Sequence, residues 1–116
     1  MEKDPVVYLN DIIFSINLIE QYLTGVSLSK FNDSYDVQDA VLRRLEIIAE
    51  ATKKLPEDLR NMHPAVSWKS IIGLRNIIAH AYNEVNLEEI WEIVTQHLPE
   101  TKRQMEEIKA SLPEIL

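Results

Sequence analysis

The chain has 116 residues, the length of a single domain spanning residues 1–116, and its 46% hydrophobic content can form a core without disulfides. It contains no cysteine, which excludes a thiol nucleophile, a thiolate metal site and a disulfide framework. The net charge of −7 argues against a protein that coats nucleic acid nonspecifically. Neither an apolar run of about 18 residues nor a signal-peptide pattern is visible, so we expect a cytoplasmic protein with no membrane association.

The first half of the chain predicts two long helices. Asp4-Pro5 is typical of an N-cap followed by a first-turn proline. Apolar residues then recur every three or four positions as far as Leu23, and Gly25 is a plausible stop. Residues 26–35 are expected to form a loop or short turn, and a second helix is expected over about 37–55. Its predicted buried stripe is Val41, Leu45, Ile48, and Ala51 or Thr52.

The second half predicts two further long helices. A brief helical turn is expected over 56–61, and a third helix over 67–81. Asn86, with Glu89 three residues later, has the spacing of a capping box and predicts the start of a fourth helix. Pro99 must kink that helix or start a new one. The predicted fold is therefore all-α: an antiparallel up-and-down bundle of four main helices plus short helical turns, with the last helix kinked near Pro99.

The third predicted helix carries a cluster of polar side chains beside an apolar run. Arg75, Asn76, His80 and Tyr82 lie within about two helical turns. Arg75 and Tyr82 almost superpose along an ideal helix, and Asn76 and His80 are i,i+4 neighbours that can touch. Arg75 and His80 are about 140° apart. Arg75 and His80 can therefore reach one pocket only from the flank of a helix or near its end.

These residue types suit RNA cleavage without a metal ion. Histidine can carry a proton near neutral pH, and arginine offers planar donors that match phosphate oxygens. Asn76 is placed to orient the imidazole of His80 or to bond a phosphate oxygen. Each residue also has a structural explanation: Arg75 could pair with a carboxylate, His80 could favour a helix terminus, and Tyr82 could close the core. The correlated spacing favours a functional motif.

The pattern Arg-Asn-x-x-x-His-x-Tyr resembles the signature of the HEPN superfamily, and specifically of its HepT-like branch of small toxin ribonucleases. The resemblance covers nearly the whole chain. The segments that are similar to successive parts of that family are residues 8–13 with 19–23, 38–48 with 50–51, 55–56, 64 with 68–76, and 90–91 with 98–99. One departure is Ala49, where glycine is expected. This position bears on helix packing and puts little of the chemistry in doubt.

The resemblance implies a toxin of a toxin–antitoxin pair that cleaves RNA, with Arg75 and His80 catalytic, Asn76 supporting, and no metal or cofactor. One chain supplies one such histidine, whereas the reaction needs a base and an acid. A symmetric homodimer would supply both groups, and the resemblance implies the same composite site. It also implies a partner, a minimal nucleotidyltransferase antitoxin, which transfers AMP from ATP to Tyr82.

A second function remains open: a non-catalytic helical module that binds nucleotide or docks the nucleotidyltransferase. Residues 41–80 hold seven cations and four anions, a net charge of +3, while the remainder holds five cations and fifteen anions, a net charge of −10. The overall acidity favours the module. The joint presence of Arg75, His80 and Tyr82 favours the enzyme.

A metal site is the weaker alternative to this chemistry. The three histidines, His63, His80 and His97, show no His-x-x-x-His spacing. Glu88, Glu89 and Glu92 fit a solvated helix face. Both tryptophans fall on apolar stripes and are expected to make core or dimer contacts.

Overall fold

The computed structural model describes the backbone of residues 4–83 and 86–113, and the side chains of those residues except 81–83. The described part of the chain is all-α and has no strand, as predicted. In chain order the elements are α1 (Pro5–Leu23), α2 (Leu28–Asp33), α3 (Tyr35–Lys54), α4 (Glu57–Asn61), α5 (Trp68–Ile72), α6 (Leu74–Asn83), α7 (Leu87–Glu92), the π-helical turn η1 (Ile93–His97) and α8 (Leu98–Ser111). None of the described helices is long and apolar enough to cross a membrane.

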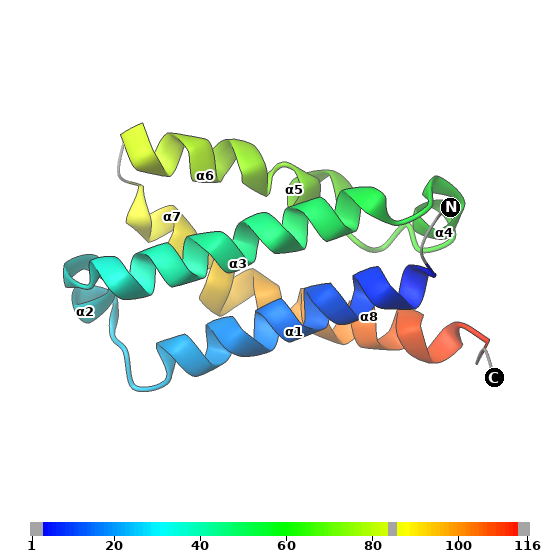
Figure 1. Ribbon diagram of the computed structural model, residues 1–116, viewed down its shortest axis with the longest axis horizontal. Helices are drawn as coiled ribbons and strands as arrows, with labels where there is room; N and C mark the ends of the chain where they lie inside the picture. Colours follow the sequence, from blue (N-terminus) through cyan, green and yellow to red (C-terminus); the bar gives the residue numbers. More distant parts are fainter. Residues whose placement is uncertain (1–3, 84–85, 114–116) are drawn as a thin grey trace.

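Four rods form the bundle: α1, α3, α5 with α6, and α7 with η1 and α8. Figure 1 shows α1 and α6 running in one direction and α3 and α8 in the other, so that the rods alternate up and down. Helix α3 is central, because it packs against α1 on one side and against α5 and α6 on the other, while α8 packs against α1. The predicted antiparallel bundle is confirmed.

The ends of α1 lie where the sequence predicts them. The Asp4 carboxylate accepts a hydrogen bond from the Val6 amide at 2.9 Å, and Pro5 occupies the first turn. The helix ends at Leu23, and Gly25 has a φ of +74°, a left-handed conformation that disfavours residues with a Cβ.

The segment expected to be a loop or short turn contains the short helix α2. Ser27 caps it, because its hydroxyl accepts a hydrogen bond from the Lys30 amide. The ring of Phe31 is fully buried and lies 5.5 Å, centroid to centroid, from that of Trp91, which packs against the core as predicted. Burial of this single aromatic ring explains why six residues hold a helical conformation here.

Gln38 joins α2 to α3 through a buried side-chain amide. Its Nε2 atom donates to the carbonyl oxygens of Phe31 and Asn32, at 2.8 and 3.1 Å. We expect Gln38→Ala to lower the free energy of unfolding by about 1–3 kcal/mol, because two hydrogen bonds are lost and each contributes about 0.5–1.5 kcal/mol. Urea titration followed by circular dichroism measures this. Gln21→Ala, at an exposed position of α1, is the control and should stay within about 0.5 kcal/mol of the parent. Equal stabilities for the two variants would contradict the role of Gln38.

The predicted buried stripe of the second long helix is confirmed. Val41, Leu45 and Ile48 are fully buried, and both Ala51 and Thr52 join them. Ala49, where the resemblance leads one to expect glycine, is also fully buried. Its single methyl group is therefore accommodated within the helix packing.

The third predicted helix is two helices, because it is interrupted at Gly73. Ser67 occupies the N-cap position of α5 without a side-chain cap hydrogen bond. A Cβ added to Gly73 would lie 3.1 Å from the Lys69 carbonyl oxygen, which already accepts the Gly73 amide at 2.9 Å. Glycine is a weak helix former, and at this position it permits a tight turn. Helix α6 then continues to Asn83, two residues beyond the expected end.

The last rod begins and bends as predicted. Asn86 Oδ1 accepts from the Glu89 amide at 3.1 Å, and the Asn86 side-chain amide donates to the Glu89 carboxylate at 3.0 Å. Before Pro99 the helix widens into η1, where the Leu98 amide bonds to the Ile93 carbonyl five residues back. Because proline has no amide hydrogen, this wider turn precedes it, and Figure 1 shows the chain changing direction between α7 and α8.

Candidate active site

Three of the motif residues, Arg75, Asn76 and His80, occupy the solvent-facing side of α6. Leu74 and Ile78 are buried and fix the inner face of the helix against the core. Arg75, Asn76 and His80 are exposed. The amphipathic pattern of α6 therefore turns the polar residues of the motif outward, as its helical period requires.

The position of α6 in the bundle leaves this outer side free of the other rods. The helix packs against α3, and Figure 1 shows it at the edge of the molecule. Neither Arg75 nor His80 forms an ion pair or a hydrogen bond with another residue whose side chain is described. Among the described side chains, the ion pair that would explain Arg75 structurally is therefore absent, whereas His80 does lie in the last turn of α6, where the helix dipole favours a cation.

Asn76 and His80 share one flank of α6, one turn apart. No hydrogen bond joins them within the described part of the chain, so the suggested role of Asn76 in orienting the imidazole stays a prediction. The backbone of Tyr82 belongs to α6. Its side chain lies outside the described residues, and so does the expected position of its hydroxyl over Arg75.

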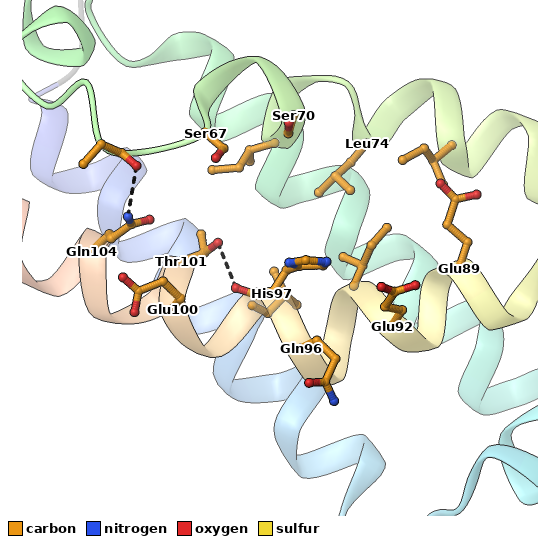
Figure 2. Close-up of a pocket in the computed structure, with 15 residues that line it drawn as sticks. Ser67, Ser70, Leu74, Glu89, Glu92, Gln96, His97, Glu100, Thr101 and Gln104 are labelled. Atoms are coloured by element: carbon orange, nitrogen blue, oxygen red, sulfur yellow. Dashed lines mark hydrogen bonds between the residues drawn. The ribbon is translucent and has the colours of Figure 1, made fainter.

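A groove of about 670 Å³ separates α5 and α6 from the last rod (Figure 2). Its floor is apolar and includes Leu74 and Ile77. Its acidic lining residues are Glu89, Glu92 and Glu100, and no lysine or arginine lines it. Figure 2 shows Glu89, together with Glu92, on the side that faces α6, so these carboxylates border a groove and are more than a solvated face.

Glu100 and His97 contribute further polar groups to this acidic groove. Arg103 donates a hydrogen bond to the Glu100 carboxylate at 2.8 Å, and this bond lowers the pKa of Glu100 below its ordinary value. His97 lies in the π-helical turn, and its ring points into the groove in Figure 2. The groove therefore presents negative charge at neutral pH and disfavours a phosphate backbone.

A second cavity of about 330 Å³ lies where α4 meets α5 and has a basic lining that includes Arg60 and Lys69. Neither this cavity nor the acidic groove is lined by Arg75, Asn76 or His80. The motif of one chain therefore lies on an open helix surface and not within either cavity. Within the described residues, no group of three or more candidate metal ligands occurs.

Comparison with known proteins identifies the family. A family model described as ribonuclease HepT-like matches residues 12–108, which is most of the chain. The chain belongs to the ribonuclease HepT-like family. A probable ribonuclease HepT of Thermococcus cleftensis is 33% identical over 109 residues, which make up 94% of this chain and 99% of the relative. No solved structure matches the chain significantly.

Another relative places the same domain in a longer protein. A protein of Methanocaldococcus jannaschii, named a gamma-glutamylcyclotransferase and candidate RNase, is 39% identical over 112 residues. The match covers 97% of this chain but only 50% of that relative, so the HepT-like domain spans half of its length. Membership of the family and the names of these relatives support a ribonuclease.

Proposed function

We propose that this HepT-like protein is a metal-independent RNA endonuclease whose active site is shared by two chains. The observation that carries the proposal is the exposure of Arg75, Asn76 and His80 on one helix at the edge of the bundle. Neither of the two cavities found among the described residues is lined by these groups. A second copy laid against α6 would convert the open surface into a cleft.

The reaction assigns a role to each residue. The ribose 2′-hydroxyl attacks the adjacent phosphorus, the bond from phosphorus to the 5′-oxygen breaks, and the products are a 2′,3′-cyclic phosphate and a free 5′-hydroxyl. One histidine takes the proton of the 2′-hydroxyl and a second gives a proton to the departing 5′-oxygen. Arg75 stabilises the charge that develops on the phosphoryl oxygens.

Two-fold symmetry supplies the second proton carrier. A dimer axis beside α6 would bring two copies of His80 and two of Arg75 to one cleft. The 140° between these side chains on an ideal helix also favours this arrangement, because the two groups point to different flanks and converge more readily between two chains than within one.

The proposal predicts that cleavage requires the dimer and no metal. We expect purified protein to cleave single-stranded RNA in the presence of a chelator. The rate per chain should fall on dilution below the dimer dissociation constant, because the active species contains two chains. A fluorogenic RNA measures the rate, and light scattering over the same concentrations measures the mass. Loss of activity in chelator would contradict the metal-independent mechanism. A rate per chain that stays constant at concentrations where light scattering finds a monomer would contradict the shared active site.

The finer part of the proposal concerns regulation. We propose a toxin of a toxin–antitoxin pair that is neutralised when a partner nucleotidyltransferase transfers AMP to Tyr82. The new bond joins the phenolic oxygen to the α-phosphorus of ATP, and pyrophosphate leaves. The phosphodiester would place negative charge and bulk on the helix that carries Arg75, where the RNA phosphate must bind.

A second candidate, a non-catalytic module that docks a nucleotidyltransferase or binds nucleotide, has one observation in its favour. The acidic groove, with its apolar floor and three carboxylates, suits a protein partner better than a nucleic acid. The cleavage assay in chelator separates the two functions, since a docking module does not cut RNA.

A further inference from the structure

The cavity between α4 and α5 has the chemistry of an anion site. Its lining residues are Glu57, Arg60, Asn61, Trp68, Lys69 and Ile72. Two cations and one carboxylate give a net charge of +1. Within the described part of the chain neither Arg60 nor Lys69 takes part in an ion pair. The cavity therefore offers uncommitted positive donors, together with the amide of Asn61.

Arg60 adds a second, independent observation. Its Nε atom is buried and has no hydrogen-bond partner among the described residues. The local backbone is fixed, because the Trp68 indole donates to the carbonyl oxygens of Arg60 and His63, each at 3.0 Å. A buried donor without a partner costs about 1–3 kcal/mol. Arg60 also lines the cavity, and a phosphate group bound there would match the planar donors of its guanidinium group.

The cavity lies on the same side of its rod as the motif. Gly73 keeps a right-handed helical conformation and bonds to the Lys69 carbonyl, so the helical winding continues from α5 into α6. Asn76 and His80 follow Lys69 by seven and eleven residues, so on a continuous ideal helix both lie within about 20° of Lys69, whereas Arg75 lies about 120° away. At about 1.5 Å of rise per residue, Lys69 and Arg75 are roughly 9 Å apart along the rod.

The other side of the rod excludes RNA. Ser70, Leu74 and Ile77 line the acidic groove, where three carboxylates and no lysine or arginine are found. A strand held at Arg75 is therefore repelled on that side and attracted toward Lys69 on the other. The two cavities together give the α5–α6 rod a negative and a positive flank.

We propose that this basic cavity is a phosphate subsite for the RNA strand. Lys69 and Arg60 bind a phosphate that neighbours the one that is cleaved, and Asn61 donates a further hydrogen bond. The inference rests on the proposed ribonuclease function and extends it to the path of the substrate. In a two-fold dimer each end of the cleft would lead to one such subsite, so RNA is held on both sides of the cut.

Binding of RNA of two lengths tests the subsite. The His80→Ala protein serves as the background, because it keeps RNA intact. Anisotropy of a labelled dinucleotide and of a single strand of roughly 12 nucleotides is measured from about 50 to 200 mM salt. In this background we expect Lys69→Gln and Arg60→Gln each to weaken binding of the longer RNA by about three- to tenfold. Each should also reduce the slope of log affinity against log salt by about 0.7.

The matched control is Lys109→Gln, which removes the same charge from an exposed position of α8. Dinucleotide binding should respond no more to Lys69→Gln than to Lys109→Gln, because a dinucleotide contains a single phosphodiester, which is bound at Arg75. If Lys69→Gln and Lys109→Gln change the affinity for the longer RNA equally, the proposed phosphate subsite is wrong, but the proposed ribonuclease function is unaffected. An equal loss on both RNA lengths places Lys69 at the cleaved phosphate and overturns a separate subsite. If the His80→Ala protein binds no RNA, the subsite and the proposed function fail together.

Discussion

Arg75→Ala and His80→Ala should each reduce the rate of RNA cleavage by at least about 100-fold. Loss of Arg75 removes the charge that stabilises the phosphoryl oxygens, and loss of His80 removes both proton carriers of a symmetric site. Because both side chains are exposed, the free energy of unfolding should change by less than about 0.5 kcal/mol. Single-turnover cleavage measures the first effect and urea titration the second.

Controls for these two variants come from the same chain. His97→Ala removes an exposed histidine outside the motif, and Arg43→Ala removes an arginine whose side chain pairs only with the exposed Glu46 in the described structure. Both controls should cleave RNA within about twofold of the parent. If Arg75→Ala or His80→Ala instead unfolds the protein, the motif is structural. If either cleaves like its control, that residue has no catalytic role.

Tyr82→Phe should remove AMP transfer completely while the protein keeps at least part of its nuclease activity. The phenol carries no proton in the proposed reaction, so its loss spares the chemistry, but it is the nucleophile of the modification. After incubation with ATP and the nucleotidyltransferase, mass spectrometry should find one AMP group on the parent chain, at Tyr82, and none on the variant. The variant should then resist neutralisation in cells.

The other tyrosines provide the internal control for this experiment. Tyr35 is 79% exposed, so accessibility alone would make it the preferred acceptor, while Tyr8 and Tyr22 are half-buried. AMP on Tyr35 would mean that exposure and not the motif selects the residue. Efficient neutralisation of the Tyr82→Phe protein would show that the partner acts by another route, such as covering the cleft.

The sequence alone determined the four rods and the composition of the motif. Helical periodicity reflects burial of one face, so the spacing of apolar residues is sufficient to infer the buried stripe of α3 and the exposed positions of Arg75 and His80. Local signals at helix ends were also sufficient where they depend on a few neighbouring residues, as with Asp4 at the start of α1 and Asn86 at the start of α7.

The tertiary structure decided the features that depend on contacts distant in sequence. Helix α2 forms because the Phe31 ring is buried beside Trp91, which is 60 residues further along the chain. The charges of Glu89 and Glu92 look like an ordinary solvated face until α5 and α6 close a groove above them. Periodicity places a side chain on one side of its own helix, but only packing determines what faces it. Packing gives the α5–α6 rod an acidic groove along one flank and a basic cavity beside α5.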